Sequence, residues 1–183
     1  RSGTGFWYIL GNQRINKMSN FKKILVPIAF SNYSQEILTF GAEIATSLGA
    51  EILIINVVNK RDLEAINRIT SYGYEVDEDH YLSTIQEERI KKLEEMVKKI
   101  SFSEDNITFD FRIGDPTDEL IKVVIEENVD LVVMGIKSKT GLEYIFTGSV
   151  ADRFYRQCPV TVISYRDKEN SERLRKHFLK TNN

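Results

Sequence analysis

The residues with the clearest chemical potential follow a short apolar run in the C-terminal half of the chain. Leu131–Met134 (LVVM) has the character of a buried strand, and it is followed by Gly135, a polar loop and the pair Gly148-Ser149. Gly135 lacks a Cβ, so we expect the chain to turn sharply there and a ligand to approach its backbone closely. Residues 149–156 are predicted to form a helix, whose first N–H groups and dipole attract an anion. The segment therefore predicts a phosphate-binding loop.

Two lysines and a run of acidic residues offer further chemistry, and each also has an ordinary explanation. Lys137 and Lys139 lie in the same loop and either pair with phosphates as point charges or are simply solvated. The acidic stretch from Glu75 to His80 precedes a predicted helix, where negative charge is favourable because of the helix dipole alone. It lacks the spacing of an established metal site, so we predict no metal centre.

Candidates for a nucleophile or a general base are few. Cys158 has no histidine near it in the sequence and is predicted to be a half-buried structural thiol. The two histidines, His80 and His177, fall at a loop edge and in the charged tail, so they nominate no Ser-His-Asp or Cys-His arrangement. We therefore expect no catalytic residues.

Composition narrows the class of protein. The chain has 183 residues, of which 42% are hydrophobic and 28% charged, as expected for one globular domain. Its net charge of -2 gives no reason to expect nucleic acid or an anionic membrane as a partner, and no apolar run approaches the ~18 residues of a membrane helix. A single cysteine excludes an internal disulfide and suits a reducing compartment. The predicted location is cytoplasmic.

The two ends of the chain are expected to lie outside the domain. The first methionine, Met18, directly precedes the first convincing strand, so residues 1–17 are interpreted as an upstream extension. Within it, the apolar stretch 6–10 is shorter than a signal-peptide core of roughly 7–15 residues. The predicted domain spans residues 18–166. The charged tail, residues 167–183, is either a frayed helix or disordered.

Apolar runs and helical periodicity alternate along the domain. The predicted strands, with continuous or alternating apolar residues, are 22–27, 51–58, 106–112, 131–134 and 160–164. The predicted helices are one capped by Ser31 or Ser34 and ending before Gly49, one over about 81–100, one capped by Asp115 or Thr117, and one over 149–156. Residues 59–80 are expected to form a long loop with a short helical piece around 63–69. Such loops commonly serve as lids or partner surfaces.

This alternation predicts one doubly wound α/β domain with an open, mostly parallel five-stranded sheet and helices on both faces. In such sheets ligands bind beyond the C-terminal ends of the strands, near the point where the strand order reverses. Pro27 ends the first strand, because proline cannot donate to a central ladder, and Gly135 ends the fourth. A binding site is therefore expected between these two strand ends, although the chain has neither the P-loop motif nor G-x-G-x-x-G.

Three segments, taken in order, resemble the universal stress protein family. They are KKILVPIAFS (Lys22–Ser31), the turn Gly114-Asp115-Pro116, and VVMGIKSKTGLEYIFTGSVADRFYRQCPVTVIS (Val132–Ser164). The resemblance covers residues 20–166 and implies a nucleotide-binding α/β fold that commonly dimerises through its last strand. In the family's ATP-binding members the loop reads G-x-x-G, nine residues, then G-S or G-T. There the Gly-Ser pair receives phosphate, and the ends of strands one, two and four hold adenine and ribose.

Carried over residue by residue, the resemblance implies a nucleotide site in this chain. Gly135 matches the first glycine of the loop, Gly148 and Ser149 match the final pair, and Val150 would add another backbone donor. Lys137 is a candidate partner for phosphate. The residues expected to line the base pocket are Pro27, Val57 and Met134.

Two positions of the implied site depart from the family pattern. Ser138 stands where the middle glycine is expected, and a left-handed backbone there would cost serine about 1–2 kcal/mol. Ala29 stands where the family usually has aspartate, in V-P-x-D, and the lost polar contact is worth on the order of 1–2 kcal/mol. Together these differences would weaken nucleotide binding by roughly tenfold to several hundredfold, without removing the phosphate loop.

The resemblance implies a stress-response regulatory protein that binds an adenine nucleotide, ATP or another, with Mg as a candidate companion ion. It also implies a homodimer through the last strand, with Val160, Val162 and Ile163 on the dimer edge. A protein partner is expected but not identified. One alternative, motivated by Ala29 and Ser138, is an interaction module of the same fold that does not bind nucleotide. A weaker alternative is a slow ATP hydrolase, against which stands the lack of a base or metal pair beside the loop.

Overall fold

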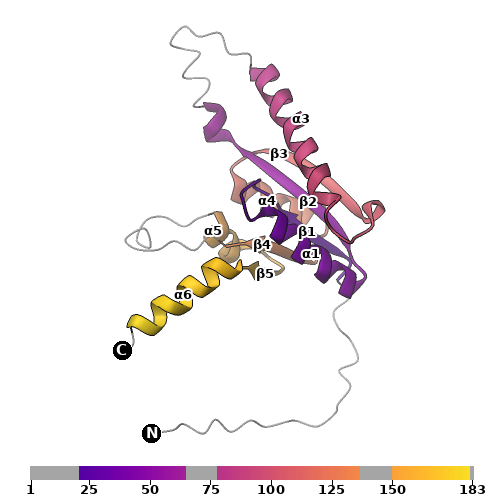
Figure 1. The fold of residues 1–183 in the computed structure, drawn as a ribbon. Coiled ribbons are helices and arrows are strands. Elements are labelled where there is room, and N and C mark those ends of the chain that lie inside the picture. Colours follow the sequence, from indigo (N-terminus) through magenta and orange to yellow (C-terminus); the bar gives the residue numbers. More distant parts are fainter. Residues whose placement is uncertain (1–20, 65–77, 137–149, 182–183) are drawn as a thin grey trace, which may run out of the picture.

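The computed structural model describes residues 21–64, 78–136 and 150–181, which form one sheet with helices on both faces (Figure 1). The sheet has five strands, each parallel to its neighbours, in the order β3-β2-β1-β4-β5. Their bounds are β1 Lys23–Pro27, β2 Glu51–Asn59, β3 Ile107–Gly114, β4 Leu131–Gly135 and β5 Thr161–Tyr165. The predicted fold class, an open and doubly wound α/β sheet, is confirmed, and the sheet is parallel throughout.

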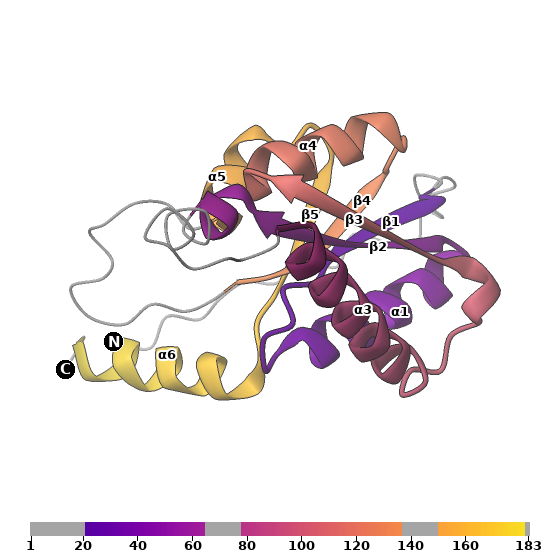
Figure 2. The same cartoon turned by 90° about the horizontal axis from the view of Figure 1, so that it is seen from above.

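The helices form two layers around the sheet (Figure 2). Helices α1 (Ser34–Leu48) and α3 (Glu78–Val97) cover one face, and α4 (Pro116–Glu126) and α5 (Val150–Gln157) cover the other. Helix α6 (Lys168–Thr181) follows β5 and leads away from the sheet. A short helical segment over residues 60–64 follows β2, and a 3-10 turn, η1 (Glu104–Asn106), precedes β3.

Strand β1 lies in the middle of the sheet and is covered on both faces. Ile24, Leu25 and Val26 are each 0% exposed. Ile24 and Val26 face the core beneath α1 and α3, whereas Leu25 faces the core beneath α4 and α5. Successive side chains of a strand point to opposite faces, so a strand covered on both faces needs a continuous apolar run. This is why the sequence of β1 shows no alternation.

Each predicted strand and helix is present, with its ends at most three residues from the predicted positions. The exception is the short helix predicted around 63–69, which begins earlier: residues 60–64 are helical, and the rest of the predicted segment lies outside the described residues. The charged tail was expected to be either a frayed helix or disordered, and the structure shows a helix, α6. The extension over residues 1–17 lies outside the described residues.

The prediction that Ser31 or Ser34 caps α1 is wrong. Tyr33 occupies the cap position and makes no side-chain hydrogen bond to the helix, and Ser34 is already helical. The hydroxyls of Ser31 and Ser34 instead lie 3.4 Å apart, and the turn is closed by the Ser34 N–H donating to the Ser31 carbonyl at 3.0 Å. The end of α1 is as predicted, because Gly49 has a φ of 65° and its N–H donates to the last turn of the helix.

Asp115 joins the start of α4 to α5. Its carboxylate accepts hydrogen bonds from the N–H groups of Thr117 (2.9 Å) and Asp118 (3.3 Å), so it is the predicted cap of α4. It also accepts one from Nη1 of Arg153 on α5 at 3.1 Å. Partial burial alone would raise the pKa of Asp115, but the bonds from Arg153 and the backbone outweigh burial and hold that pKa below its usual value.

We expect this carboxylate to make stability depend on pH. A depressed folded-state pKa adds stability that is present above the unfolded pKa and is lost as pH falls through the folded value. Asp115→Asn can still cap the helix but cannot titrate, so its unfolding free energy should fall less than that of the wild type below about pH 5. Urea unfolding at pH values from neutral to acidic measures this. The same slope in both proteins would contradict the assignment, and Asp105→Asn in the exposed turn η1 is the control.

Candidate functional site

A cavity of about 380 Å³ lies where the C-terminal ends of β1, β2 and β4 meet. The chain runs from β1 outward to β3 in one direction and places β4 and β5 on the other side of β1, so the order reverses between β1 and β4. The connections after these two strands leave toward opposite faces and open a crevice at the strand ends. The cavity occupies this crevice.

Several of the predicted site residues are brought together here. Those that line the cavity are Pro27, Ala29, Val57, Met134, Gly135 and Val150. Other predicted residues lie outside the described part of the chain, namely Lys137, Ser138, Gly148 and Ser149. The structure therefore shows the expected base-pocket positions around one cavity, and it does not describe the phosphate end.

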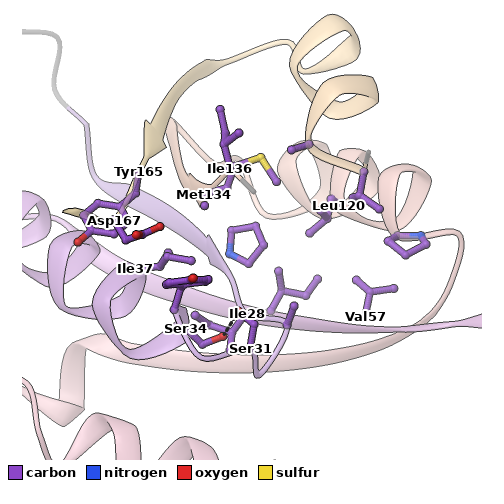
Figure 3. A pocket seen from close by; sticks show the side chains of 18 residues that line it. Ile28, Ser31, Ser34, Ile37, Val57, Leu120, Met134, Ile136, Tyr165 and Asp167 are labelled. Atoms are coloured by element: carbon purple, nitrogen blue, oxygen red, sulfur yellow. Dashed lines mark hydrogen bonds between the residues drawn. The ribbon is translucent and has the colours of Figure 1, made fainter. Parts of the chain in front are cut away.

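The walls of the cavity are largely apolar, with polar groups gathered on one side (Figure 3). Val57 and Leu120 lie at one end, and Tyr165 and Asp167 lie at the other. Within the described part of the chain, the lining residues include no lysine, arginine or histidine, and Asp167 is their one carboxylate. A largely apolar cavity with a few convergent polar groups suits a flat aromatic ligand with some hydrogen-bonding atoms.

Sequence reasoning missed the wall contributed by the start of α1 with the turn before it, and by the end of β5 with the residues that follow. The residues of this wall are Ser31, Tyr33, Ser34, Ile37, Tyr165 and Asp167. Asp167 is the first residue of the tail that is expected to lie outside the domain, and Tyr165 directly follows the predicted strand 160–164. The signal that could have found them is their position directly after a predicted parallel strand, because all such strand ends meet at one edge of the sheet.

Tyr165 is anchored at the polar end of the cavity. Its ring packs against Phe40 with centroids 5.1 Å apart, and its hydroxyl donates to Oε2 of Glu36 at 3.3 Å. Burial raises the pKa of the Tyr165 phenol, and the negative charge of Glu36 raises it further. Next to it, Asp167 is only 5% exposed. These two residues give the cavity a neutral hydroxyl and a buried carboxylate at the same end.

Gly135 makes room for a neighbouring side chain and does not use the conformational freedom of glycine. The φ of Gly135 does not lie in the left-handed region. Among the described glycines, only Gly49 has such a φ. A Cβ on Gly135 would lie 2.4 Å from Cδ1 of Ile37, which is far inside contact distance. The chain that would make the expected turn, from residue 137 on, lies outside the described residues. At Gly135 itself, the missing side chain leaves room for Ile37 of α1 beside the cavity.

The remaining sequence candidates show no reactive arrangement in the described residues. Cys158 is half-buried as predicted, and burial raises the pKa of its thiol, which makes it a poor nucleophile at neutral pH. Among the residues described, no three of His, Cys, Asp and Glu are grouped as metal ligands would be, and Glu75 and Asp77 lie outside that part of the chain. In the same residues, no helix combines the length and apolar character needed to cross a bilayer.

The predicted dimer edge is the outer strand of the sheet. β5 pairs with β4 on one side and is the last strand in the order. Val160, Val162 and Ile163 are each partly exposed.

We expect the contact between Gly135 and Ile37 to be measurable as a coupling. Gly135→Ala should destabilise the protein by about 1–3 kcal/mol, because the new methyl group meets Cδ1 of Ile37. Ile37→Val removes that carbon, so Gly135→Ala should cost less in the Ile37→Val background. Urea unfolding of the four proteins gives the coupling free energy. Additive effects would show that Gly135 is not held by this contact.

Comparison with known proteins supports one family across most of the chain. The model of the Universal stress protein family matches residues 20–166. Universal stress protein MJ0531 of Methanocaldococcus jannaschii is 31% identical over 165 residues, which are 89% of this chain and 94% of the relative. Universal stress protein MJ0577 of the same organism is 25% identical over 153 residues, which are 78% of this chain and 94% of the relative.

Solved structures share the fold. The structure of hypothetical protein MJ0577 superposes with a TM-score of 0.61 at 24% identity, covering 82% of this chain and all of that chain (100%). A universal stress protein in complex with cAMP gives a TM-score of 0.58 at 18% identity, covering 81% and 98% of the two chains. The universal stress protein from Archaeoglobus fulgidus in complex with dAMP gives a TM-score of 0.54 at 17% identity, covering 81% of this chain and 100% of that chain. On the extent of the family match, and in agreement with the resemblance of its sequence motifs, this chain belongs to the universal stress protein family.

Proposed function

We propose that this protein is a cytoplasmic regulatory protein of the stress response that binds an adenine nucleotide in the cavity between β1 and β4. The observation that carries the proposal is the cavity itself. Its volume of about 380 Å³ lies within the range of small-molecule sites, roughly 300–1,000 Å³. Pro27, Val57 and Met134, the positions that the family resemblance gives to the base, are among its lining residues.

Relatives supply independent support for the class of ligand. One universal stress protein of the same fold was solved in complex with cAMP, and the protein of Archaeoglobus fulgidus was solved in complex with dAMP. Both ligands are adenine nucleotides that differ in the sugar and phosphate. We infer that the base is the common element, and that an apolar cavity such as this one is suited to it.

Charge gives the ligand a direction in the cavity. Helix α5 begins at Val150, on the cavity wall, and the start of a helix attracts an anion. The phosphates would therefore lie toward α5 and the Gly148-Ser149 pair that precedes it, with Mg as their candidate companion. The base would lie between Val57 and Met134.

The proposed protein acts by binding rather than by turnover. Among the described residues, those that line the cavity include no histidine or lysine to serve as a base, which gives the slow ATP hydrolase no support. We further propose that β5 pairs with its two-fold mate to form a homodimer, which would present the bound state to a protein partner. The alternative of a nucleotide-free interaction module is favoured by one observation: residue 29, on the cavity wall, is an exposed alanine without a polar side chain.

We expect a bulky side chain in the cavity to block binding. Val57→Trp should weaken the affinity for ATP, ADP or AMP at least tenfold, because the indole would occupy the space proposed for the base. Ile125→Trp is the matched control, since Ile125 lies on α4 with 63% of its surface exposed and does not line the cavity. Isothermal titration calorimetry measures both. Wild-type protein that binds none of the three nucleotides at millimolar concentration would overturn the nucleotide proposal and favour the interaction module.

Restoring the family carboxylate should strengthen binding. Ala29→Asp places an acceptor on the cavity wall, and a hydrogen bond to a charged group worth about 1.5 kcal/mol corresponds to about tenfold in affinity. Ala29→Asn is the uncharged control and should give a smaller gain. If Ala29→Asp binds no more tightly than wild type, the ligand does not reach residue 29 as proposed.

A further inference from the structure

We propose that Arg89 of α3 is a positioning residue for the cavity, which it serves by holding the loop after β1 through Asn56. Through this contact the docking of α3 on the sheet and the occupancy of the cavity become coupled. The inference rests on the proposed function, because the occupant is the adenine nucleotide. Figure 2 shows α3 on the face of the sheet that also carries α1, away from α4 and α5.

A chain of hydrogen bonds connects α3 to the cavity wall. Nη1 of Arg89 donates to Oδ1 of Asn56, and Nδ2 of Asn56 donates to the carbonyl of Ile28 at 2.6 Å. Asn56 is 3% exposed, so both bonds are made away from water. Ile28 lines the cavity, and its own N–H donates to the carbonyl of Ile55 at 2.8 Å. The cavity wall is thus tied on one side to β2 and on the other to α3.

The donors and acceptors of Arg89, Asn56 and Ile28 allow only one direction for this chain of hydrogen bonds. A guanidinium has only donors, so it must face the oxygen of the Asn56 amide. The amide nitrogen then faces the Ile28 carbonyl, which has only lone pairs to offer. An aspartate at position 56 would also accept from Arg89, but it would present a second oxygen to the carbonyl of Ile28. Asparagine is therefore the residue that serves both neighbours.

Arg89 also contacts two aromatic rings, one of which, Phe30, belongs to the same loop after β1. The Cζ atom of Arg89 lies 5.9 Å from the ring centroid of Phe30 and 5.8 Å from that of Phe111 on β3. Both distances fall within the range of cation–π contacts. Phe30 has a φ of 51°, a left-handed conformation that is uncommon for a bulky residue and needs support from its surroundings. Arg89 supplies such support beside Ala29, which lines the cavity.

An apolar side chain would fill the same space without the cost of burying a charge. Burial lowers the pKa of Arg89, and the nearby Tyr81 and Asp62 offset this only in part, so the charge is partly desolvated. The hydrogen-bond and ring partners of Arg89, which are Asn56, Phe30 and Phe111, are neutral. A half-buried cation is retained at a cost, so its specific bonds have a consequence that packing alone would not provide. That consequence is the placement of the backbone at Ile28 to Phe30.

Coupling of this kind is reciprocal. If docked α3 places the cavity wall for the ligand, then a bound ligand must favour docked α3 by the same factor. Arg89→Met keeps an unbranched side chain about as long as the stem of arginine but loses the guanidinium, with its donors and its charge. Leu93→Ala is the matched control: Leu93 lies one turn further along α3, is 6% exposed, and packs in the core without lining the cavity.

The experiment combines calorimetry with hydrogen exchange on the full chain, using ADP as the probe at a temperature where every variant is folded. In wild type, ADP should slow exchange in α3. Arg89→Met should bind ADP about tenfold more weakly and lose this response, whereas Leu93→Ala should keep affinity within about twofold and keep the response. Asn56→Asp should weaken binding while α3 stays docked, because it breaks only the bond to Ile28.

The outcomes separate the two proposals. Wild type that binds no adenine nucleotide overturns the proposed function and this inference with it. Wild type that binds ADP without any response in α3 overturns the coupling alone. Arg89→Met with wild-type affinity, or Leu93→Ala with as large a loss as Arg89→Met, overturns the positioning role. If Arg89→Met does not fold, the ADP affinity of Asn56→Asp tests the proposal instead. An unchanged affinity in that variant overturns the role of the hydrogen bonds that link Arg89 to Ile28 through Asn56.

Discussion

The burial of β1 at the centre of a parallel sheet is the constraint on which the rest of the structure depends. Its residues Ile24, Leu25 and Val26 are completely buried, and the strand pairs with β2 on one side and β4 on the other. A strand in this position must be apolar on both faces and must end where the chain turns away from the sheet, here at Pro27. Because the strand order reverses beside it, the end of β1 is also where a ligand site can open. Fold and cavity thus have one cause.

The fold could be predicted well because short stretches of the sequence indicate where its strands and helices begin and end. Continuous apolar runs mark strands covered on both faces, and Gly49 marks the end of α1. The errors have equally physical reasons. The hydroxyls of Ser31 and Ser34 lie against each other instead of capping α1, because the turn before the helix places Tyr33 at the cap position. Gly135 has the expected place but another reason, since its neighbour Ile37 comes from a helix almost 100 residues earlier in the sequence.

The site could be predicted only where it follows strand ends. Pro27, Val57 and Met134 come from the ends of strands that periodicity identifies, and the family resemblance gives them a role. Tyr165 ends the last strand and carries no motif that marks it as a site residue, and Asp167 falls in the charged tail that is expected to lie outside the domain. Arg89 falls on the apolar stripe of its helix, but its partner Asn56 lies 33 residues away, and their contact depends on how α3 crosses the sheet. Long-range pairs of this kind are invisible to periodicity.

The central claim is that an adenine nucleotide binds in the cavity between β1 and β4. Methyl NMR of the full chain during titration with ATP tests it most directly, because it reports where the ligand binds and whether it binds. The account predicts that the methyl signals of Val57, Met134 and Ile37 shift in a saturable way, while those of the exposed Ile90 and Ile125 do not. Unchanged signals at millimolar ATP, or shifts confined to residues outside the cavity, would contradict it.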